Sequence, residues 1–180
     1  MTTAQLNLLK PVRKVLLFWL VFVFLTPSLP AAHAADDPYI KTVWLTLQAG
    51  RLSPYKRFFK NEDPLPLLNI VWDTAEEHHL PPELILAVIH VESHFDRFAV
   101  SRVGAIGLMQ VMPFWLPVLE QPEANLLVDK ENIELGCTIL RRYLDRESGN
   151  FDRALQRYNG SLGESTYSDK VKIWWDYYYF

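Results

Sequence analysis

The chain has 180 residues, of which 49% are hydrophobic and 22% are charged, and its formal net charge is −3. This composition is typical of one globular domain and excludes a disordered chain. The acidic balance also argues against nucleic acid as a partner, because binding to a phosphate backbone requires clustered basic side chains. We therefore expect a globular protein with no nucleic-acid ligand.

The first 34 residues have the pattern of a secretory signal. Lys10, Arg13 and Lys14 precede an apolar run of eleven residues, VLLFWLVFVFL, and the segment ends in Ala-His-Ala at residues 32–34. The run is shorter than the roughly 20 residues that a membrane-spanning helix needs. We expect a signal peptide that is cleaved after residue 34, with an uncleaved N-terminal anchor as the alternative.

The part after the predicted signal, residues 35–180, is expected to form a single domain. The signal contains three basic and no acidic residues, so this part has 15 basic against 21 acidic side chains and a net charge of −6. Cys137 is the only cysteine, which excludes an internal disulfide. Core packing must therefore hold the fold, and we expect a monomer.

Helix patterns dominate the first half of this part. A first helix is predicted over residues 38–50, and its apolar side chains share one face: Ile40, Val43, Trp44 and Leu47. Residues 51–66 are predicted to be an irregular connection. A helix over about residues 67–79 follows, and a Pro-Pro-Glu sequence starts the next helix, which contains residues 84–93.

The second half continues in the same way. After a turn marked by glycines, residues 108–112 (LMQVM) are predicted to form a short helix. Asp129 is predicted to cap a long helix that reaches Arg146. Cys137 lies in the apolar stripe of this helix, which favours a buried, inert thiol over a reactive one.

Two further helices are predicted, a short one around residues 151–158 and a last one near the C-terminus. The last helix carries large side chains on one face: Tyr167, Val171, Trp174 and Tyr178. We expect Trp174 and Tyr178 to pack on the core, with a sugar-stacking platform as the alternative use of the aromatic C-terminus. No stretch alternates with a period of two, so the fold class is predicted to be all-α or nearly so.

Glu92 stands out among these residues. It follows Ile89 by three positions, Val88 by four and Ile85 by seven, so it shares an apolar helix face with them. An apolar setting disfavours the carboxylate and raises its pKa. A carboxylic acid that stays protonated near neutral pH can donate a proton to a leaving oxygen. The alternative is a solvated glutamate in a fraying last turn.

The sequence around Glu92, HVESH, also has to be weighed as a metal motif. His90 and His94 share a helix face, but Glu92 points nearly the opposite way. The zinc protease order is H-E-x-x-H, in which the glutamate directly follows the first histidine. The spacing here differs and the sequence offers no third ligand, so we expect no metal site.

Three motifs follow one another along the chain: "ES-x-F" at residues 92–95, "AVS-x-x-GAIGLMQVMP" at 99–113 and "YNGS" at 158–161. In this order and at this spacing they resemble the soluble lytic transglycosylase family, which belongs to the lysozyme-like superfamily. The resemblance covers roughly residues 75–172, a little over half of the chain.

The resemblance implies a lysozyme-like helical fold and an enzyme that cleaves the β-1,4 bond between N-acetylmuramic acid and N-acetylglucosamine in peptidoglycan, without a cofactor. Glu92 matches the family's single catalytic glutamate. It would protonate the glycosidic oxygen and then take a proton from the C6 hydroxyl of the muramoyl sugar, which closes a 1,6-anhydro ring. The substrate's N-acetyl group would stabilise positive charge at C1. The expected partners are peptidoglycan glycan strands, and the expected location is the bacterial periplasm or cell envelope.

The resemblance also implies substrate-binding roles for residues outside the "GLMQ" sequence. Ser101 matches a serine near the catalytic glutamate, and a turn-forming hydroxyl is the alternative. Tyr158 matches a tyrosine beside that glutamate, where its hydroxyl could orient Glu92 or the acetamido group of the sugar. Asn159 is expected to shape the adjoining loop at the binding site.

Within "GLMQ", the resemblance implies contacts with the sugar. Gly107 would let the backbone approach the sugar closely, and an ordinary tight turn is the alternative. Met109 and Gln110 match the groove-lining part of the motif. Their alternatives are a core position for Met109 and a surface position for Gln110.

Asp96 departs from the family pattern, which has Asn-Pro where this chain has Asp96-Arg97. Because Asp96 follows Glu92 by four residues, a lysozyme-like pair of carboxylates is one reading. The family match places Asp96 at a structural turn, which is the reading we favour.

Two rivals to the transglycosylase reading remain. A muramidase would hydrolyse the same bond with water, and a catalytically silent peptidoglycan-binding or assembly protein would keep the fold alone. A partner in the cell-envelope machinery is also compatible with the sequence, which does not identify one.

Overall fold

The computed structural model describes residues 38–59, 61 and 63–179. The predicted signal, residues 1–34, lies outside the described residues. Within the described ranges, every helix falls short of the length and apolar content that crossing a bilayer requires.

The described chain is built from helices, and β-structure is limited to isolated bridges in it. This confirms the all-α prediction. A 3-10 helix, η2, replaces part of the irregular connection expected after the first helix. The elements in chain order are α1 (Pro38–Arg51), η2 (Ser53–Phe58), α2 (Leu65–His78), α3 (Pro82–Ser93), α4 (Trp115–Val118), α5 (Asp129–Arg146), α6 (Phe151–Asn159) and α7 (Thr166–Tyr179).

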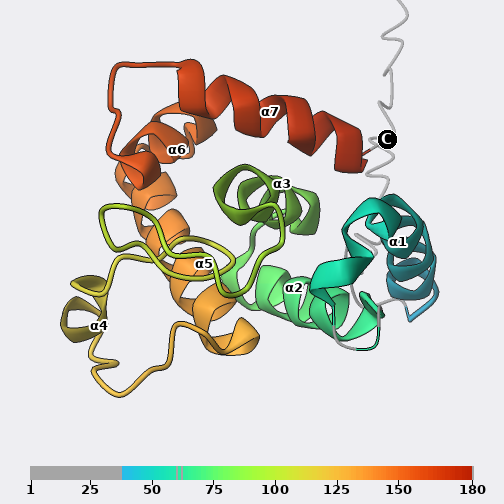
Figure 1. Cartoon of the computed structure of the whole chain (residues 1–180). Helices are drawn as coiled ribbons and strands as arrows, with labels where there is room; N and C mark the ends of the chain where they lie inside the picture. Colours follow the sequence, from blue (N-terminus) through green and yellow to red (C-terminus); the bar gives the residue numbers. More distant parts are fainter. Residues whose placement is uncertain (1–37, 60, 62, 180) are drawn as a thin grey trace, which may run out of the picture. The chain divides into compact units, whose positions relative to one another are not determined.

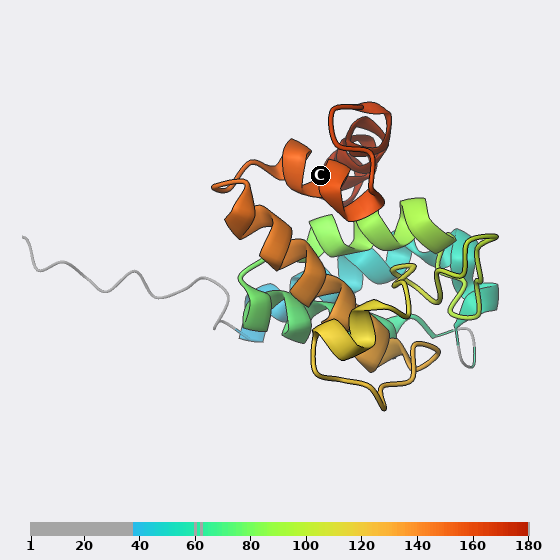
Figure 2. The ribbon, with the colours of Figure 1, turned by 90° about the vertical axis from the view of Figure 1, so that its left-hand side faces the viewer.

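Helix α3 lies at the centre of the core. Figure 1 shows α7 on one side of α3 and α2 on the other, and Figure 2 shows α7 lying over α3 in a second view. All residues from 84 to 90 of α3 are buried. A helix that is apolar on every side is suited to this place, because each of its faces meets another element. Helix α5 contacts α2 and α6, and α6 contacts α7.

The last helix follows its predicted pattern. Tyr167, Val171 and Tyr178 are buried on α7, and Trp174 is half-buried with its ring stacked on His90 at 3.4 Å between centroids. The core-packing prediction for Trp174 and Tyr178 is therefore confirmed. Cys137 is fully buried in α5, and burial raises the pKa of its thiol, as expected for an inert cysteine.

The apolar face predicted for helix α1 is only partly buried. Of its four residues, Trp44 is buried, while Ile40, Val43 and Leu47 are exposed. The Trp44 ring meets Trp72 at 5.2 Å, and its indole Nε1 donates a hydrogen bond to Glu83 at 2.8 Å. The buried side of α1 also contains a polar residue, Gln48, whose amide donates a hydrogen bond to the backbone oxygen of Tyr178. The buried side of α1 is thus the side that bears Trp44 and Gln48, and it overlaps only in part with the apolar face.

The prediction of a short helix at residues 108–112 is wrong. This segment folds back as a tight turn, in which Ile106 and Val111 exchange two backbone hydrogen bonds of 3.0 Å and form an antiparallel bridge. Gly107 and Gln110 both have a positive φ, at 80° and 50°, which a helix does not allow. Because glycine tolerates a positive φ, Gly107 would have allowed a turn to be predicted here from the sequence.

The predicted cap of α5 is also wrong. Val128 occupies the N-cap position and no side chain caps the helix there, while Asp129 belongs to the first turn. Asp129 instead forms an ion pair with Arg97 at 3.1 Å. An acidic residue in the first turn still interacts favourably with the helix dipole.

The packing of α5 against the tight turn generates a stability prediction. A Cβ atom at Gly136 would lie 2.5 Å from Met109 Sδ and 2.8 Å from its Cβ. Met109 is fully buried, so it has no free space to move into. We expect Gly136→Ala to lower the free energy of unfolding by about 1–3 kcal/mol, although alanine favours helix by about 1 kcal/mol. Chemical denaturation followed by circular dichroism measures the change.

Gly50→Ala is the matched control, because a Cβ at Gly50 meets nothing within 4 Å. This variant should be neutral or slightly stabilising. Equal stability of Gly136→Ala and wild type would contradict the tight packing of α5 against Met109.

Candidate active site

Glu92 lies in the last turn of α3, which ends at Ser93. Its carboxyl Oε1 accepts a hydrogen bond of 2.6 Å from the hydroxyl of Tyr167. Burial raises the pKa of Glu92 to about 7, and the Tyr167 hydrogen bond opposes part of that rise. The apolar setting expected from the helical spacing is therefore present. At neutral pH the acid and the carboxylate of Glu92 coexist, which suits a group that first donates and then accepts a proton.

Tyr167 reaches Glu92 from the first turn of α7, and it is itself buried. Burial and the neighbouring Glu92 carboxylate raise the pKa of Tyr167 well above its ordinary value. The phenol therefore keeps its proton and can donate to Glu92 throughout the neutral range. The sequence placed Tyr167 only in the core stripe of the last helix. A buried tyrosine hydroxyl needs a polar partner, and from this requirement a contact between Tyr167 and a polar group could have been predicted.

Glu92 opens onto a pocket of about 310 Å³. Its walls come from the end of α3, the end of α6, the loop after α6 and the start of α7. Of the site residues predicted from the sequence, Glu92 and Asn159 line it. The lining residues are Val91, Glu92, Asn159, Ser161, Glu164, Thr166, Tyr167 and Lys170.

The Tyr158 hydroxyl forms its hydrogen bond with a group other than Glu92. It donates a hydrogen bond of 2.8 Å to the backbone oxygen of Met109, which ties α6 to the tight turn. Burial, and then the Glu92 charge, raise the pKa of Tyr158 well above its ordinary value. The structure thus places the direct hydrogen bond to Glu92 on Tyr167, while Tyr158 contributes to the shape of the region behind it.

The Ser101 hydroxyl stabilises a turn. It accepts a hydrogen bond of 2.9 Å from the backbone N–H of Ala105, and the backbone N–H of Ser101 donates to the oxygen of Ala105. Gly107 lies against α5, where an added Cβ would stand 2.4 Å from the amide nitrogen of Asn132. Both residues occupy the turn positions that were the alternatives to sugar contact.

Met109 and Gln110 are also engaged within the fold. Met109 is fully buried, so its side chain would have to leave the core to contact a sugar. The Gln110 amide donates hydrogen bonds to the backbone oxygens of Ala99 and Gly107, at 3.1 and 3.0 Å. In this structure both side chains stabilise the turn that lies next to the end of α3.

Two polar residues to which the sequence analysis assigned no role hold this turn in place. The buried Asn132 side chain accepts from the N–H of Met109 at 2.8 Å and donates to the oxygens of Ile106 and Leu126 at 2.9 Å. The buried Ser93 hydroxyl donates to the oxygen of Leu108 at 2.8 Å. These bonds fix the turn to α5 and to the residue next to Glu92.

Asp96 occupies a turn, as the family match implied. Its Oδ1 accepts a hydrogen bond of 2.9 Å from the backbone N–H of Phe98. It is absent from the lining of the Glu92 pocket, where the other carboxylate is Glu164. Glu164 is exposed to solvent, so the two carboxylates of the pocket have very different surroundings.

His90 and His94 do not form a metal site in the described structure. Both ring nitrogens of His90 contact tyrosine hydroxyls, Nε2 that of Tyr55 at 3.0 Å and Nδ1 that of Tyr178 at 2.9 Å. Burial, and then the neighbouring His94, lower the pKa of His90 to about 4, so it is neutral at physiological pH. Among the described residues, no three His, Cys, Asp or Glu side chains are arranged to hold a metal ion.

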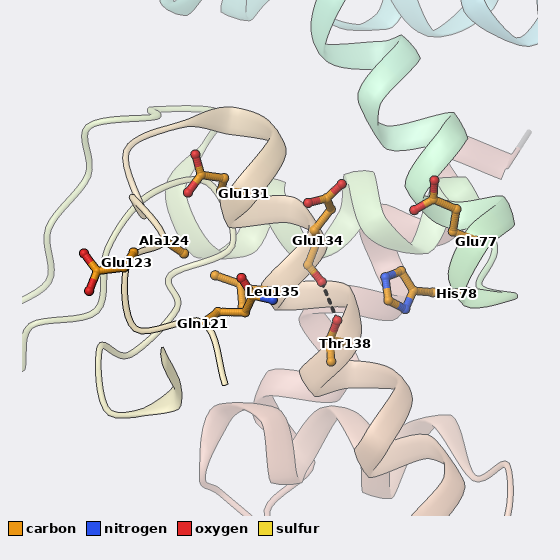
Figure 3. A pocket seen from close by; sticks show the side chains of 9 residues that line it. All are labelled: Glu77, His78, Gln121, Glu123, Ala124, Glu131, Glu134, Leu135 and Thr138. Carbon is orange, nitrogen blue, oxygen red and sulfur yellow. Dashed lines mark hydrogen bonds between the residues drawn. The ribbon is translucent and has the colours of Figure 1, made fainter. Parts of the chain in front are cut away.

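A second, larger pocket of about 470 Å³ lies between the end of α2, the first half of α5 and the loop before α5 (Figure 3). Four glutamates line it, but Glu77 and Glu123 are exposed. Glu131 accepts a hydrogen bond from the N–H of Asn125, and Glu134 forms an ion pair with Lys130. These carboxyls are either exposed or bound by a backbone N–H or an ammonium group, so this pocket is not the candidate for acid catalysis.

Comparison with known proteins gives consistent matches. The chain is 33% identical over 105 residues to the "Transglycosylase" of Enterobacteria phage PRD1, covering 56% of this chain and 38% of that protein. It is 34% identical over 124 residues to "Membrane-bound lytic murein transglycosylase C" of Yersinia pestis, covering 58% of this chain and 35% of that protein. The chain thus spans little more than a third of the length of these relatives.

A solved structure of the lytic transglycosylase Slt of Pseudomonas aeruginosa, an inactive mutant, matches with a TM-score of 0.48 and 27% identity. The match covers 59% of this chain and 19% of that one. The family model described as "Transglycosylase SLT domain" matches residues 70–172. This range contains Glu92 and every other residue that lines its pocket. Because the family match spans more than half of the sequence, the chain belongs to the transglycosylase SLT domain family.

Proposed function

We propose that this protein is a peptidoglycan lytic transglycosylase in which Glu92 is the single general acid and base. The observation that carries the proposal is one carboxyl with a pKa near 7, half-buried at the end of α3, hydrogen-bonded by Tyr167 and open to a pocket. Family membership and the names of the relatives, a transglycosylase and a lytic murein transglycosylase, support the same activity.

The reaction has two proton transfers. Protonated Glu92 donates its proton to the oxygen of the β-1,4 bond, and the N-acetylglucosamine side leaves as an alcohol while positive charge develops at C1 of the muramoyl sugar. The Glu92 carboxylate then accepts the proton of the C6 hydroxyl, and O6 bonds to C1. The product is a 1,6-anhydromuramoyl end, and Glu92 returns to its protonated form.

Tyr167 positions the carboxyl group during both transfers. It holds Oε1 and leaves Oε2 for the substrate. The hydroxyl at C6 is already attached to the reacting sugar, which gives it an entropic advantage over a free water molecule. A hydrolase would need a bound water and a second group to activate it. In this pocket burial raises the pKa of the Glu92 carboxyl, whereas Glu164 is exposed.

Muramidase activity is the second candidate because Glu164 lines the same pocket. Two carboxylates flanking the scissile bond are the usual arrangement of hydrolytic glycosidases. Glu164 is exposed, and its carboxylate forms no hydrogen bond or ion pair within the described residues, so nothing fixes that carboxylate at a defined place. This mobility disfavours the role of a precisely placed base.

The setting of the reaction is part of the proposal. Peptidoglycan as substrate implies a protein exported to the bacterial periplasm or cell envelope, in keeping with the signal-like sequence of residues 1–34. One relative is named a membrane-bound enzyme, which also points to the envelope. We propose a monomer that acts on glycan strands. A partner from an envelope machinery could direct it to one place in the wall.

Digestion of purified peptidoglycan tests the proposed function. We expect the products to carry 1,6-anhydromuramoyl ends, because no free water is needed to complete the reaction. Each anhydro end is lighter than a hydrolysed end by one water, so chromatography with mass spectrometry distinguishes them. A digest dominated by reducible muramic acid ends would instead establish a muramidase, and Glu164→Gln would then be the next variant to assay.

Glu92→Gln should lower the rate of glycan cleavage by at least about 1,000-fold, because the amide cannot transfer a proton. The fold should remain, since glutamine has the same size and its oxygen can still accept the Tyr167 hydrogen bond. Turnover of labelled peptidoglycan and thermal unfolding measure the two effects. Asp96→Asn is the control and should keep most activity, because Asp96 stabilises a turn. A comparable loss in Asp96→Asn would support a two-carboxylate mechanism.

Tyr167→Phe should move the activity profile toward higher pH. The lost hydrogen bond favours the Glu92 carboxylate, so its removal raises the pKa of Glu92 above about 7. The first step needs protonated Glu92, and the alkaline limb of the kcat/KM profile moves up with that pKa. We expect kcat/KM to fall about tenfold at the optimum through lost orientation. An unchanged alkaline limb would show that Tyr167 does not influence Glu92.

A further inference from the structure

Lys170 lies in the wall of the Glu92 pocket, one helical turn after Tyr167 on α7. It is exposed, and within the described residues no carboxylate lies within ion-pair distance of it. Its neighbour Lys172, on the same helix, behaves differently, since its ammonium contacts Asp152 at 2.8 Å and Asp169 at 3.0 Å. The pocket thus contains a positive charge that the described fold leaves uncompensated.

A second polar group of this wall also lacks a partner. The hydroxyl of Ser161 is buried and forms no hydrogen bond, although it lines the same pocket. A buried hydroxyl without a partner costs free energy, and a bound ligand can supply the missing bond. Asn159 adds an exposed amide to the wall. Ammonium, hydroxyl and amide together offer hydrogen-bond donors, which is the chemistry that binds a carboxylate.

The pocket also contains the proposed acid, Glu92, so in the proposed function a group bound there belongs to one of the two sugars that the cleaved bond joins. Of the two sugars of peptidoglycan, only the muramoyl sugar has a lactyl group, which ends in a carboxylate or extends into a peptide stem with carboxylates of its own. We propose that Lys170 binds a carboxylate carried by the muramoyl sugar, with Ser161 as an adjacent donor. This inference rests on the proposed function and names the substituent that the site selects.

Glu164 helps to choose between the two carboxylates. It lines the same pocket, and its negative charge would repel a bare lactyl carboxylate. A peptide stem also has N–H groups, which can donate hydrogen bonds to Glu164 while a stem carboxylate meets Lys170. The combination of one unpaired cation and one unpaired anion therefore favours peptide-bearing strands over bare glycan.

Binding experiments in a Glu92→Gln background separate recognition from cleavage. Isothermal titration would use three ligands of equal glycan length: a peptide-bearing strand, the same strand stripped of peptides by an amidase, and a chito-oligosaccharide, which has no carboxylate. Lys170→Met keeps the length of the side chain and removes its charge. We expect this change to weaken binding of the peptide-bearing strand about fivefold, the effect of one partly exposed ion pair of about 1 kcal/mol.

The matched control is Lys172→Met, which removes the same charge from the same helix outside the pocket and should bind all three ligands as the background does. Weaker binding of peptide-bearing strands alone would identify a stem carboxylate as the ligand. Equal weakening for the stripped strand would identify the lactyl carboxylate. Unchanged binding of every ligand, or equal weakening that includes the chito-oligosaccharide, would overturn the proposal. A background protein that binds none of the three would contradict the proposed function itself.

Discussion

The packing of α7 along α3 is the interaction on which the rest of the site depends. It buries the end of α3 that bears Glu92, and it brings the Tyr167 hydroxyl within 2.6 Å of the Glu92 carboxyl. Burial and the hydrogen bond act on the pKa of Glu92 in opposite directions, and burial is the larger effect. The acid strength of Glu92 is therefore a property of a helix interface.

The same interface accommodates a histidine without a buried charge. His90 stacks on Trp174 and lies between the hydroxyls of Tyr55 and Tyr178, so each ring nitrogen has a partner. Burial keeps His90 neutral at physiological pH by lowering its pKa to about 4. A neutral ring with both nitrogens satisfied avoids the cost of a buried ion. His90 lies on α3 two residues before Glu92, and its contacts with Trp174 and Tyr178 join α3 to α7, while Tyr55 reaches it from η2.

Much of this arrangement could be predicted from the sequence, because long apolar patterns report burial directly. The helical spacing of Glu92 from Ile85, Val88 and Ile89 allowed either a raised pKa or a solvated glutamate, and the family motifs favoured the first. The apolar pattern predicted less well in α1 and in the tight turn. In α1, the buried side contains Trp44 and the polar residue Gln48, and the other three residues of the apolar stripe are exposed. In the tight turn, positive φ values at Gly107 and Gln110 exclude the helix that its composition favours.

The motif residues of the tight turn show why a sequence match can identify the family of a protein without identifying the role of each matched residue. Met109 fills the space beside Gly136, and Gln110 bonds the backbone of its own turn. Tyr158 and Asn132 reach the same segment from α6 and α5. Each of these residues is needed to place the turn beside Ser93, whose hydroxyl bonds the oxygen of Leu108. A motif can thus mark a catalytic region while most of its side chains serve the backbone. In the proposed mechanism the proton transfers depend on two side chains, Glu92 and Tyr167, and the packing of segments distant in the sequence brings these two together.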